Sequence, residues 1–289
     1  MEFCMTLDSA PASPIDVAED TSDLAIQTRN FSMVTGRRNT GRATTGAAIN
    51  LDIPLGALFV VSGRFASGKT ALLLALAGRL RGFTGTATVF GHPLRRAGGR
   101  VRHLSALAET PLVNRLDDDL TVERQIAAAL VLRQPWWRPL VSHKTVALCL
   151  IRVNAVLRLV DARAGALLGT GTAGLPCLTG TDRIGDLQPL DRAVLGVVVA
   201  LIGRPRLLIV DDVDTLRDTD DRTRVWAALL TVRMAGWHDL TIAASGQDPK
   251  ELLEVLERIN ADEPALARPA YLLDLDSDER TLTALTRKA

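Results

Sequence analysis

The stretch Gly63-Arg64-Phe65-Ala66-Ser67-Gly68-Lys69-Thr70 decides the fold of this chain. It has the pattern G-x-x-x-x-G-K-[ST], with an apolar strand at 58–61 before it and an apolar helix at 71–77 after it. In such a loop the backbone N–H groups and the N-terminus of the helix converge on phosphate, and the glycines allow a close approach. We expect Lys69 to contact the outer phosphates and the Thr70 hydroxyl to bind Mg²⁺. The alternative is a Gly/Ser turn that matches by chance, but the correct flanks favour a nucleoside triphosphate site.

A second acidic element follows far along the chain, at Leu207-Leu208-Ile209-Val210-Asp211-Asp212. This is an apolar strand that ends in two carboxylates, the form of a Walker B motif. Asp211 is expected to hold Mg²⁺ through its water shell, and Asp212 to act as the base that orients an attacking water. A strand that simply ends in an acidic turn is the alternative, and the phosphate loop upstream favours the catalytic interpretation.

The composition indicates a globular chain that works in a reducing compartment. Its 289 residues are 47% hydrophobic, enough for a substantial core, and the net charge of +1 argues against bulk electrostatic binding of nucleic acid. Three cysteines and four histidines show neither a disulfide framework nor paired metal-ligand spacing. The longest apolar runs, 146–151 and 197–202, are far shorter than the roughly twenty residues that cross a bilayer. Any link to a membrane is therefore expected to run through a partner.

The chain divides by pattern into a tail, a β-rich entry and a helical insertion. Residues 1–23 lack periodicity and the basic, then apolar, start of a secretory signal, so they predict a disordered tail. The segment 121–161 is helical in pattern. Further strands are predicted at 24–31, 47–53, 86–90, 100–104 and 240–245, and further helices at 144–160, 192–201, 220–234 and 249–259, with 35–45 as a polar connection.

Two adjacent tryptophans, Trp136 and Trp137, lie in a proline-flanked break of the helical segment. They are candidates for the anchor of a protein partner. The alternative is that both rings cap the core of the helical segment.

From about Leu24 to Leu275 the chain resembles the nucleotide-binding subunit of an ATP-binding cassette (ABC) transporter. The resemblance rests on the order and spacing of the phosphate loop, the Walker B segment and the stretches 50–56, 74–80, 84–93, 120–123 and 204–211. It implies an α/β fold in which a P-loop NTPase (RecA-like) core carries an N-terminal antiparallel β-subdomain and an α-helical subdomain at about 119–190, within a nucleotide-binding domain at 24–289. It further implies that ATP is sandwiched between two such chains, and that a groove between core and helical subdomain receives a helix of a membrane subunit.

The sequence departs from the family pattern at the signature segment. Where the family has Leu-Ser-Gly-Gly-Gln, this chain has Leu187-Gln188-Pro189-Leu190-Asp191. The family's segment offers a serine hydroxyl and glycine N–H groups to the γ-phosphate of the opposite subunit. Here Pro189 removes a donor and Leu190 adds bulk.

Other positions that serve hydrolysis also differ. Asp212 stands where the family has glutamate, the segment 104–108 lacks the family's glutamine, and Gln247 replaces the switch histidine. An adenine-stacking aromatic is missing near 34–35, although Phe31 is close in sequence. These changes leave ATP binding largely intact and weaken hydrolysis.

The resemblance predicts an ATP-binding subunit, peripheral to the inner face of the cell membrane, that binds and slowly hydrolyses ATP to drive integral-membrane partner subunits. It would pair as a homodimer, or as a heterodimer in which a different ATP-binding subunit supplies an intact signature segment. Its cofactors would be ATP and Mg²⁺, with the whole segment 63–70 around nucleotide, Thr70 and Asp211 on the metal, Asp212 as base and Gln247 at the γ-phosphate.

Three alternatives stay open from sequence. The first is a non-hydrolysing subunit that senses ATP or serves a structural role in a membrane complex. The second is a soluble ABC-type protein that acts on nucleic acid or ribosomes, against which the near-neutral charge argues. The third, a small-molecule kinase, lacks an evident acceptor site or lid.

Overall fold

A computed structural model describes most of the chain. The described residues are 23–35, 43–110, 114–134, 137, 140–232, 239–262, 269–277 and 280–285. Almost all of the predicted tail, most of the predicted connection 35–45, and Trp136 lie outside these residues.

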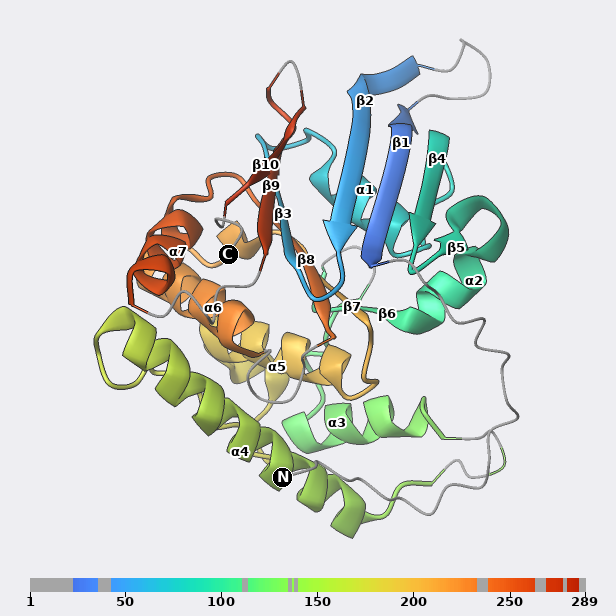
Figure 1. Cartoon of the computed structure of the whole chain (residues 1–289). Helices are drawn as coiled ribbons and strands as arrows, with labels where there is room; N and C mark the ends of the chain where they lie inside the picture. Colours follow the sequence, from blue (N-terminus) through green and yellow to red (C-terminus); the bar gives the residue numbers. More distant parts are fainter. Residues whose placement is uncertain are drawn as a thin grey trace.

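A small antiparallel sheet forms the N-terminal part of the fold. It consists of β1 (Leu24–Thr35), β2 (Ala43–Pro54), β4 (Phe83–Val89) and β5 (His92–Pro93), in the order β2-β1-β4-β5. The strands predicted at 24–31, 47–53 and 86–90 correspond to β1, β2 and β4, and each observed strand is longer than predicted. Phe31 is fully buried here and stacks on Phe83 with 4.9 Å between ring centroids. This sheet stands at the upper right of Figure 1.

The second sheet is the centre of the molecule. Its strands lie in the order β10-β9-β3-β8-β7-β6, and all neighbours are parallel except β10, which runs antiparallel to β9. A parallel sheet covered on both faces needs continuous apolar strands, as in the fully buried β7. The bounds are β3 Leu58–Ser62, β6 Ser105–Leu107, β7 Leu207–Val210, β8 Thr241–Gly246, β9 Ala270–Asp274 and β10 Leu282–Ala284.

The central strand β3 joins two hydrophobic cores because successive side chains point to opposite faces of a sheet. Phe59 and Val61 belong to the core shared with the small sheet and α1 (Lys69–Leu76), which contacts both sheets. Leu58 and Val60 belong to the core shared with the helices on the other face. Those helices include α5 (Pro189–Leu201), α6 (Thr219–Thr231) and α7 (Lys250–Asp262). The α/β P-loop NTPase architecture with an antiparallel β-subdomain is confirmed.

One predicted strand is wrong. Residues 100–104 form the end of α2 (Leu94–Leu104), and β6 begins at Ser105. Leu94 and Val101, seven residues apart, are the buried residues of α2, and most of its other side chains are exposed and basic. That spacing is two helical turns, which fits an amphipathic helix better than a half-buried strand.

The helical insertion is built on two capped helices. The Thr121 side chain accepts the N–H of Arg124 at the start of α3 (Val122–Val131), and the Ser142 side chain accepts that of Thr145 at the start of α4 (His143–Leu168). α4 ends at Gly169, which has the left-handed φ of 71° common for a helix C-cap. Two 3-10 turns, η1 (Ile184–Asp186) and η2 (Val213–Thr215), precede α5 and α6 respectively.

The long helix α4 lies along the outer edge of the molecule, packed against α3, α6 and α7 (Figure 1). Within the described part of the chain, no helix is both long and apolar enough to cross a membrane. Trp137, just before α4, has 63% of its surface exposed, so its ring does not cap the helical core. Of the two interpretations of the tryptophans, core capping is thus wrong for Trp137.

Candidate nucleotide-binding site

Three loops of the predicted site come together at one edge of the parallel sheet. The phosphate loop (residues 63–70) comes directly after β3. Asp211 and Asp212 come directly after β7, and Gln247 comes directly after β8. Because β8 pairs in parallel with both β3 and β7, the carboxyl ends of the three strands are neighbours. In parallel α/β sheets this edge is where ligands bind.

Two glycines give the phosphate loop its shape. Gly63 has φ of 148°, which residues with a side chain rarely adopt, and a Cβ built there would lie 2.7 Å from Ser67 Oγ, so a larger residue would strain the loop. Gly68 is the N-cap of α1 with φ of 100°, and no side chain caps this helix. The first N–H groups of α1 are therefore left to a ligand.

Lys69 lies inside the loop that it serves. Its Nζ donates hydrogen bonds to the carbonyl oxygens of Gly63 and, at 3.0 Å, of Arg64, and the residue is 8% exposed. The ammonium group thus sits in the concave side of the loop, where it can reach an outer phosphate.

The hydroxyl of Ser67 supports this assignment. Among the described residues, Ser67 Oγ is a buried side-chain oxygen that has no hydrogen-bond partner. Buried polar atoms are almost always hydrogen-bonded, so an orphan inside a phosphate-loop cradle fits an incoming anion. Thr70, the second residue of α1, is half-buried. The residues present therefore fit a nucleotide phosphate chain.

A contact that the sequence did not reveal holds the loop from outside. Asp276, just after β9, accepts the backbone N–H of Arg64 at 2.7 Å and lies 3.3 Å from the Arg64 guanidinium. Asp276 is in turn held by its own N–H, which donates to Asp274. The sequence signal that could have indicated it is the apolar run 270–273, which Asp274 and Asp276 follow.

Ser245 connects the carboxylate of Asp211 with the backbone of Asp212. Its Oγ donates to Asp211 Oδ1 at 2.7 Å and accepts the backbone N–H of Asp212 at 2.9 Å. Ser245 is completely buried at the end of β8. It fixes the orientation of Asp211, the candidate metal ligand, and sequence reasoning missed it.

Asp212 has an unusual backbone and an altered acidity. Its φ of 57° and ψ of 65° are left-handed, which is uncommon outside glycine. Burial, followed by the charges of Asp214 and Asp211, raises the pKa of Asp212, while the charge of Lys69 opposes the rise. The influence of Lys69 shows that the phosphate loop and the Walker B segment share one electrostatic environment. A raised pKa makes a carboxylate a stronger base.

Gln247 is held through its backbone. Its N–H donates to Asp214 Oδ2 in η2, and its side chain is exposed. Asp214 thus connects the segment after β7 with the segment after β8. The Gln247 side chain is left at the open edge of the site.

The altered signature segment begins α5 three residues earlier than predicted. Pro189 is in the first turn of α5, a position that suits proline, and Leu190 is 6% exposed and belongs to the helical core. The bulk of Leu190 is therefore absorbed by the core and does not obstruct the face of the segment. Phe31, the aromatic residue nearest in sequence to the missing adenine partner, is stacked inside the small sheet and does not serve that role.

The segment after β6, where the family's glutamine is missing, carries Glu109. Its carboxylate accepts three hydrogen bonds from Arg192 in α5, at 2.6 to 3.0 Å, and Arg192 also contacts Asp118 at 2.5 Å. Arg192 is 23% and Glu109 17% exposed. This partly buried pair joins the end of β6 to the first turns of the signature helix.

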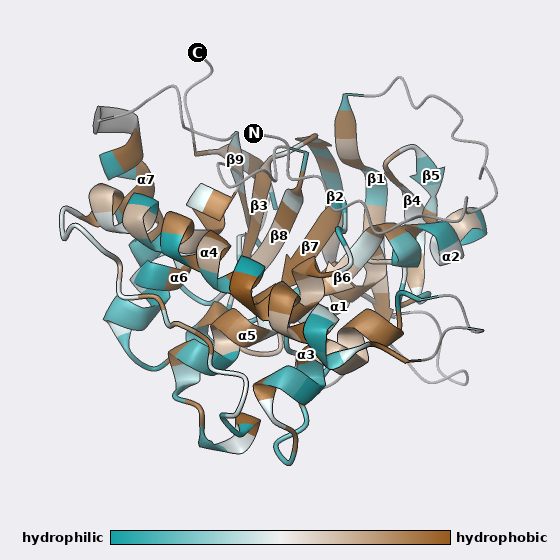
Figure 2. Cartoon of the chain, turned by 90° about the horizontal axis from the view of Figure 1, so that it is seen from below, coloured by the Kyte–Doolittle hydropathy of each residue, from teal (hydrophilic) through white to brown (hydrophobic). Residues whose placement is uncertain are grey.

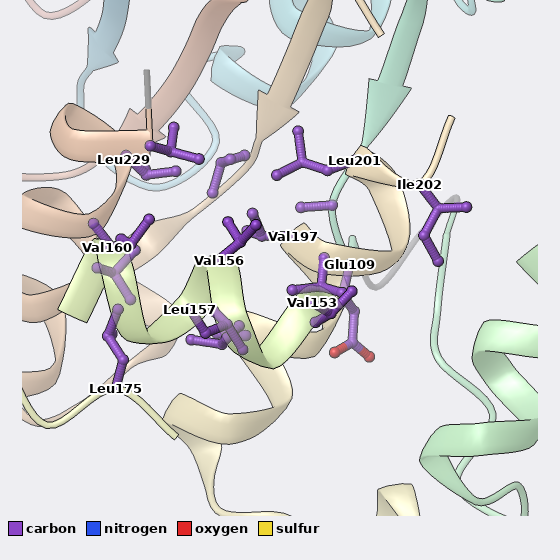
Figure 3. Close-up of a pocket in the computed structure, with 18 of the residues that line it drawn as sticks. Glu109, Val153, Val156, Leu157, Val160, Leu175, Val197, Leu201, Ile202 and Leu229 are labelled. Carbon is purple, nitrogen blue, oxygen red and sulfur yellow. The ribbon is translucent and has the colours of Figure 1, made fainter. Parts of the chain in front are cut away.

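A cavity of about 1140 Å³ lies between α4, α5 and α6 and extends to Asp211 and Asp212. Figure 3 shows its apolar lining, with Val153 and Val156 of α4 facing Val197 of α5 and Leu229 of α6. Glu109 stands at one end of the labelled residues. The cavity therefore connects the helical insertion with the Walker B end of the site.

Comparison with known proteins agrees with this fold. No family model matches the chain. A Streptomyces coelicolor protein, provisionally named an ABC transporter ATP-binding protein, is 29% identical over 204 residues, which are 68% of this chain and 64% of that protein. The chain thus covers less than two thirds of the length of that relative.

Solved structures with the same fold are ABC cassettes. The dimeric bacterial ABC transporter cassette MJ0796 has a TM-score of 0.64 at 12% identity, over 91% of this chain and all of that one. The cbiO1 protein of Clostridium perfringens, part of the ABC transporter complex cbiONQ, has a TM-score of 0.60 at 14% identity, over 87% of this chain and 85% of that one. The chain therefore has the fold of an ABC cassette. Its resemblance to the ATP-binding subunits of ABC transporters, first indicated by its motifs, is confirmed.

Proposed function

We propose that this chain is the ATP-binding subunit of an ABC-type transporter. The observation that carries the proposal is the phosphate loop, in which the buried Ser67 hydroxyl is left for a ligand. The charge of Lys69 in this loop also acts on the carboxylate of Asp212. The relatives named above support the transporter assignment.

The roles of the residues follow from their places. ATP phosphates would rest on the N–H groups of residues 63–70 and on Lys69, and Thr70 and Asp211 would hold Mg²⁺. When bound, Mg²⁺ neutralises charge on the phosphates. Asp212, with its raised pKa, would take the proton of the attacking water. Gln247 would contact the γ-phosphate.

The partners would be integral-membrane subunits and a second ATP-binding chain. The apolar cavity between α4, α5 and α6 is proposed to receive side chains of a helix from a membrane subunit, which would hold this chain at the inner face of the cell membrane. A second chain, either a copy or a different ATP-binding subunit, would close the site with its signature segment.

The test of the site is Lys69→Ala, with binding of ATP and Mg²⁺ measured by calorimetry. Lys144→Ala, an exposed lysine on α4, is the matched control. We expect Lys69→Ala to abolish measurable binding and Lys144→Ala to retain that of the parent. Equal affinity in Lys69→Ala and the parent would refute the site.

Hydrolysis needs its own measurement, because ATP binding and turnover are separate steps. We expect the purified chain to release phosphate slowly and Asp212→Asn to stop this release while ATP still binds. Binding without any turnover, in the chain alone and together with its membrane subunits, would favour an ATP-sensing role.

A further inference from the structure

The outer face of α4 carries an exposed apolar stripe. Leu148 and Ile151 are 54% and 64% exposed, Leu159 is 44% exposed, and Ala155 between them is also exposed. Positions 148, 151, 155 and 159 recur at helical spacing, so they form one continuous band. Residues 148 and 159 are about 16 Å apart along the helix axis, so the band covers the middle of α4, which has 26 residues.

This stripe is separate from the inner face of the same helix. Val146, Leu157, Val160 and Ala164 are buried in the helical core. α4 is therefore apolar on two sides, and the core uses only one of them. Figure 2 shows hydrophobic residues along α4 in the view from below.

Basic residues flank the exposed stripe. Lys144, Arg152 and Arg158 are exposed and lie beside the stripe by helical spacing, and Arg152 also reaches the rim of the cavity described above. The acidic residue of this helix, Asp161, is half-buried, and its Oδ1 accepts the N–H of Leu175. The outer face is thus apolar at its centre and positive at its edges.

Two more exposed apolar residues precede the helix in the sequence. Trp137 is 63% and Leu140 is 88% exposed, directly before α4. Tryptophan is enriched where proteins meet the headgroup region of a bilayer. An apolar band with tryptophan at one end and Lys/Arg along its flanks is the pattern of a helix that lies in a membrane surface.

We propose that the outer face of α4 rests directly on an anionic lipid bilayer. The charge on the face argues for this occupant. A second copy of the same face would bring like charges together, and a neutral apolar partner would leave the basic flanks without a counter-charge. Anionic headgroups provide that charge to both flanks while the acyl region takes up the aliphatic side chains. This contact does not depend on nucleotide binding, and it adds a lipid contact to the protein contacts proposed above.

The test is flotation of the purified full chain with lipid vesicles that contain no protein. We expect binding to vesicles of an equal mixture of phosphatidylglycerol and phosphatidylcholine, little binding to pure phosphatidylcholine, and weaker binding as salt rises. Arg152→Gln/Arg158→Gln should lower the affinity by about fivefold for each charge removed. Leu148→Ser/Ile151→Ser should also weaken it.

Matched controls change the same chemistry elsewhere. Arg96→Gln/Arg100→Gln removes two exposed charges from α2, and Leu55→Ser removes an exposed leucine from the turn before β3. Both should bind vesicles as the parent does, and all variants should keep the parent's ATP affinity and melting temperature. The proposal is overturned if the parent does not bind anionic vesicles, which would leave the face to an acidic partner helix. It is equally overturned if the α4 and α2 arginine variants bind alike.

Discussion

Replacing Ser245 with alanine isolates the support of the Walker B carboxylates. Ser245→Ala removes one hydroxyl from a fully buried position and leaves the rest of β8 unchanged. Asp211 loses a donor at 2.7 Å, and the backbone N–H of Asp212 loses its acceptor at 2.9 Å. The variant therefore breaks one charge-assisted and one neutral hydrogen bond.

The expected loss of stability follows from these two contacts. A hydrogen bond to a charged group contributes about 1.5–3 kcal/mol, and a neutral one about 1 kcal/mol. Both partners are half-buried, which limits the cost of leaving them unpaired, so we expect Ser245→Ala to lower the free energy of unfolding by about 2 kcal/mol. Partners that orient a metal ligand typically matter by about 10- to 100-fold in metal affinity. We therefore also expect the gain in ATP affinity that Mg²⁺ provides to fall by at least about tenfold.

Urea unfolding and ATP titration, with Mg²⁺ and with a chelator, measure the two effects. The matched control is Thr241→Val on the same strand, a fully buried residue whose Oγ1 accepts the N–H of Gly56 at 3.1 Å. It removes one neutral hydrogen bond, so about 1 kcal/mol should be lost without a change in the Mg²⁺ effect.

The reasoning is refuted if Ser245→Ala destabilises the protein no more than Thr241→Val does. It is also refuted if ATP affinity responds to Mg²⁺ as strongly in Ser245→Ala as in the parent. Either result would mean that Asp211 is oriented by something other than the Ser245 hydroxyl.

Three further changes test other parts of the structure. Arg222→Met leaves the carboxylate of Glu251, which is 10% exposed, without its guanidinium partner, so the free energy of unfolding should fall by about 3–5 kcal/mol. Arg222→Met/Glu251→Met should largely restore the stability, as unfolding measurements can show. The hydrogen bond from Arg192 lowers the pKa of Asp118 from its ordinary 3.8. Their pairing therefore stabilises the fold above pH 3.8, and this stabilisation is lost as the pH falls through the lowered pKa. Arg192→Met should flatten the acid end of the curve of unfolding free energy against pH. Gly63→Ala puts a side chain at φ of 148° and 2.7 Å from Ser67 Oγ, so the loop must distort. A filter-binding assay should find clearly less retained ATP, and normal retention would contradict the cradle geometry.

The phosphate loop and the Walker B strand could be predicted from sequence because each is a local pattern. Each of the motifs at 63–70 and 207–212 is complete within eight residues or fewer, so it can be recognised without knowing the fold. The apolar composition of the strands at 58–61 and 207–210 also predicts that they are buried. The start of the helical segment at residue 121 could be predicted for the same reason.

The supporting contacts could not be predicted because they join distant segments. Ser245 meets Asp211 across 34 residues, and Asp276 meets Arg64 across 212. Their discovery requires the order of strands in the sheet, which no local pattern contains. The role of Leu190 was misjudged for a related reason. In sequence, its bulk suggests that it obstructs the face of the signature segment. In the structure, α5 begins at Pro189 and places the Leu190 side chain in the core.

The order of strands also determines when the nucleotide site can exist during synthesis. β3, which carries the phosphate loop, pairs with β8 and β9, and residues 241–246 and 270–274 are made long after residue 70. A ribosome would therefore release the loop sequence early, while its strand still has no neighbour on either side. The last contact, from Asp276, arrives later still. A nascent chain should thus become able to retain ATP only after residue 276 has been made and has left the ribosome.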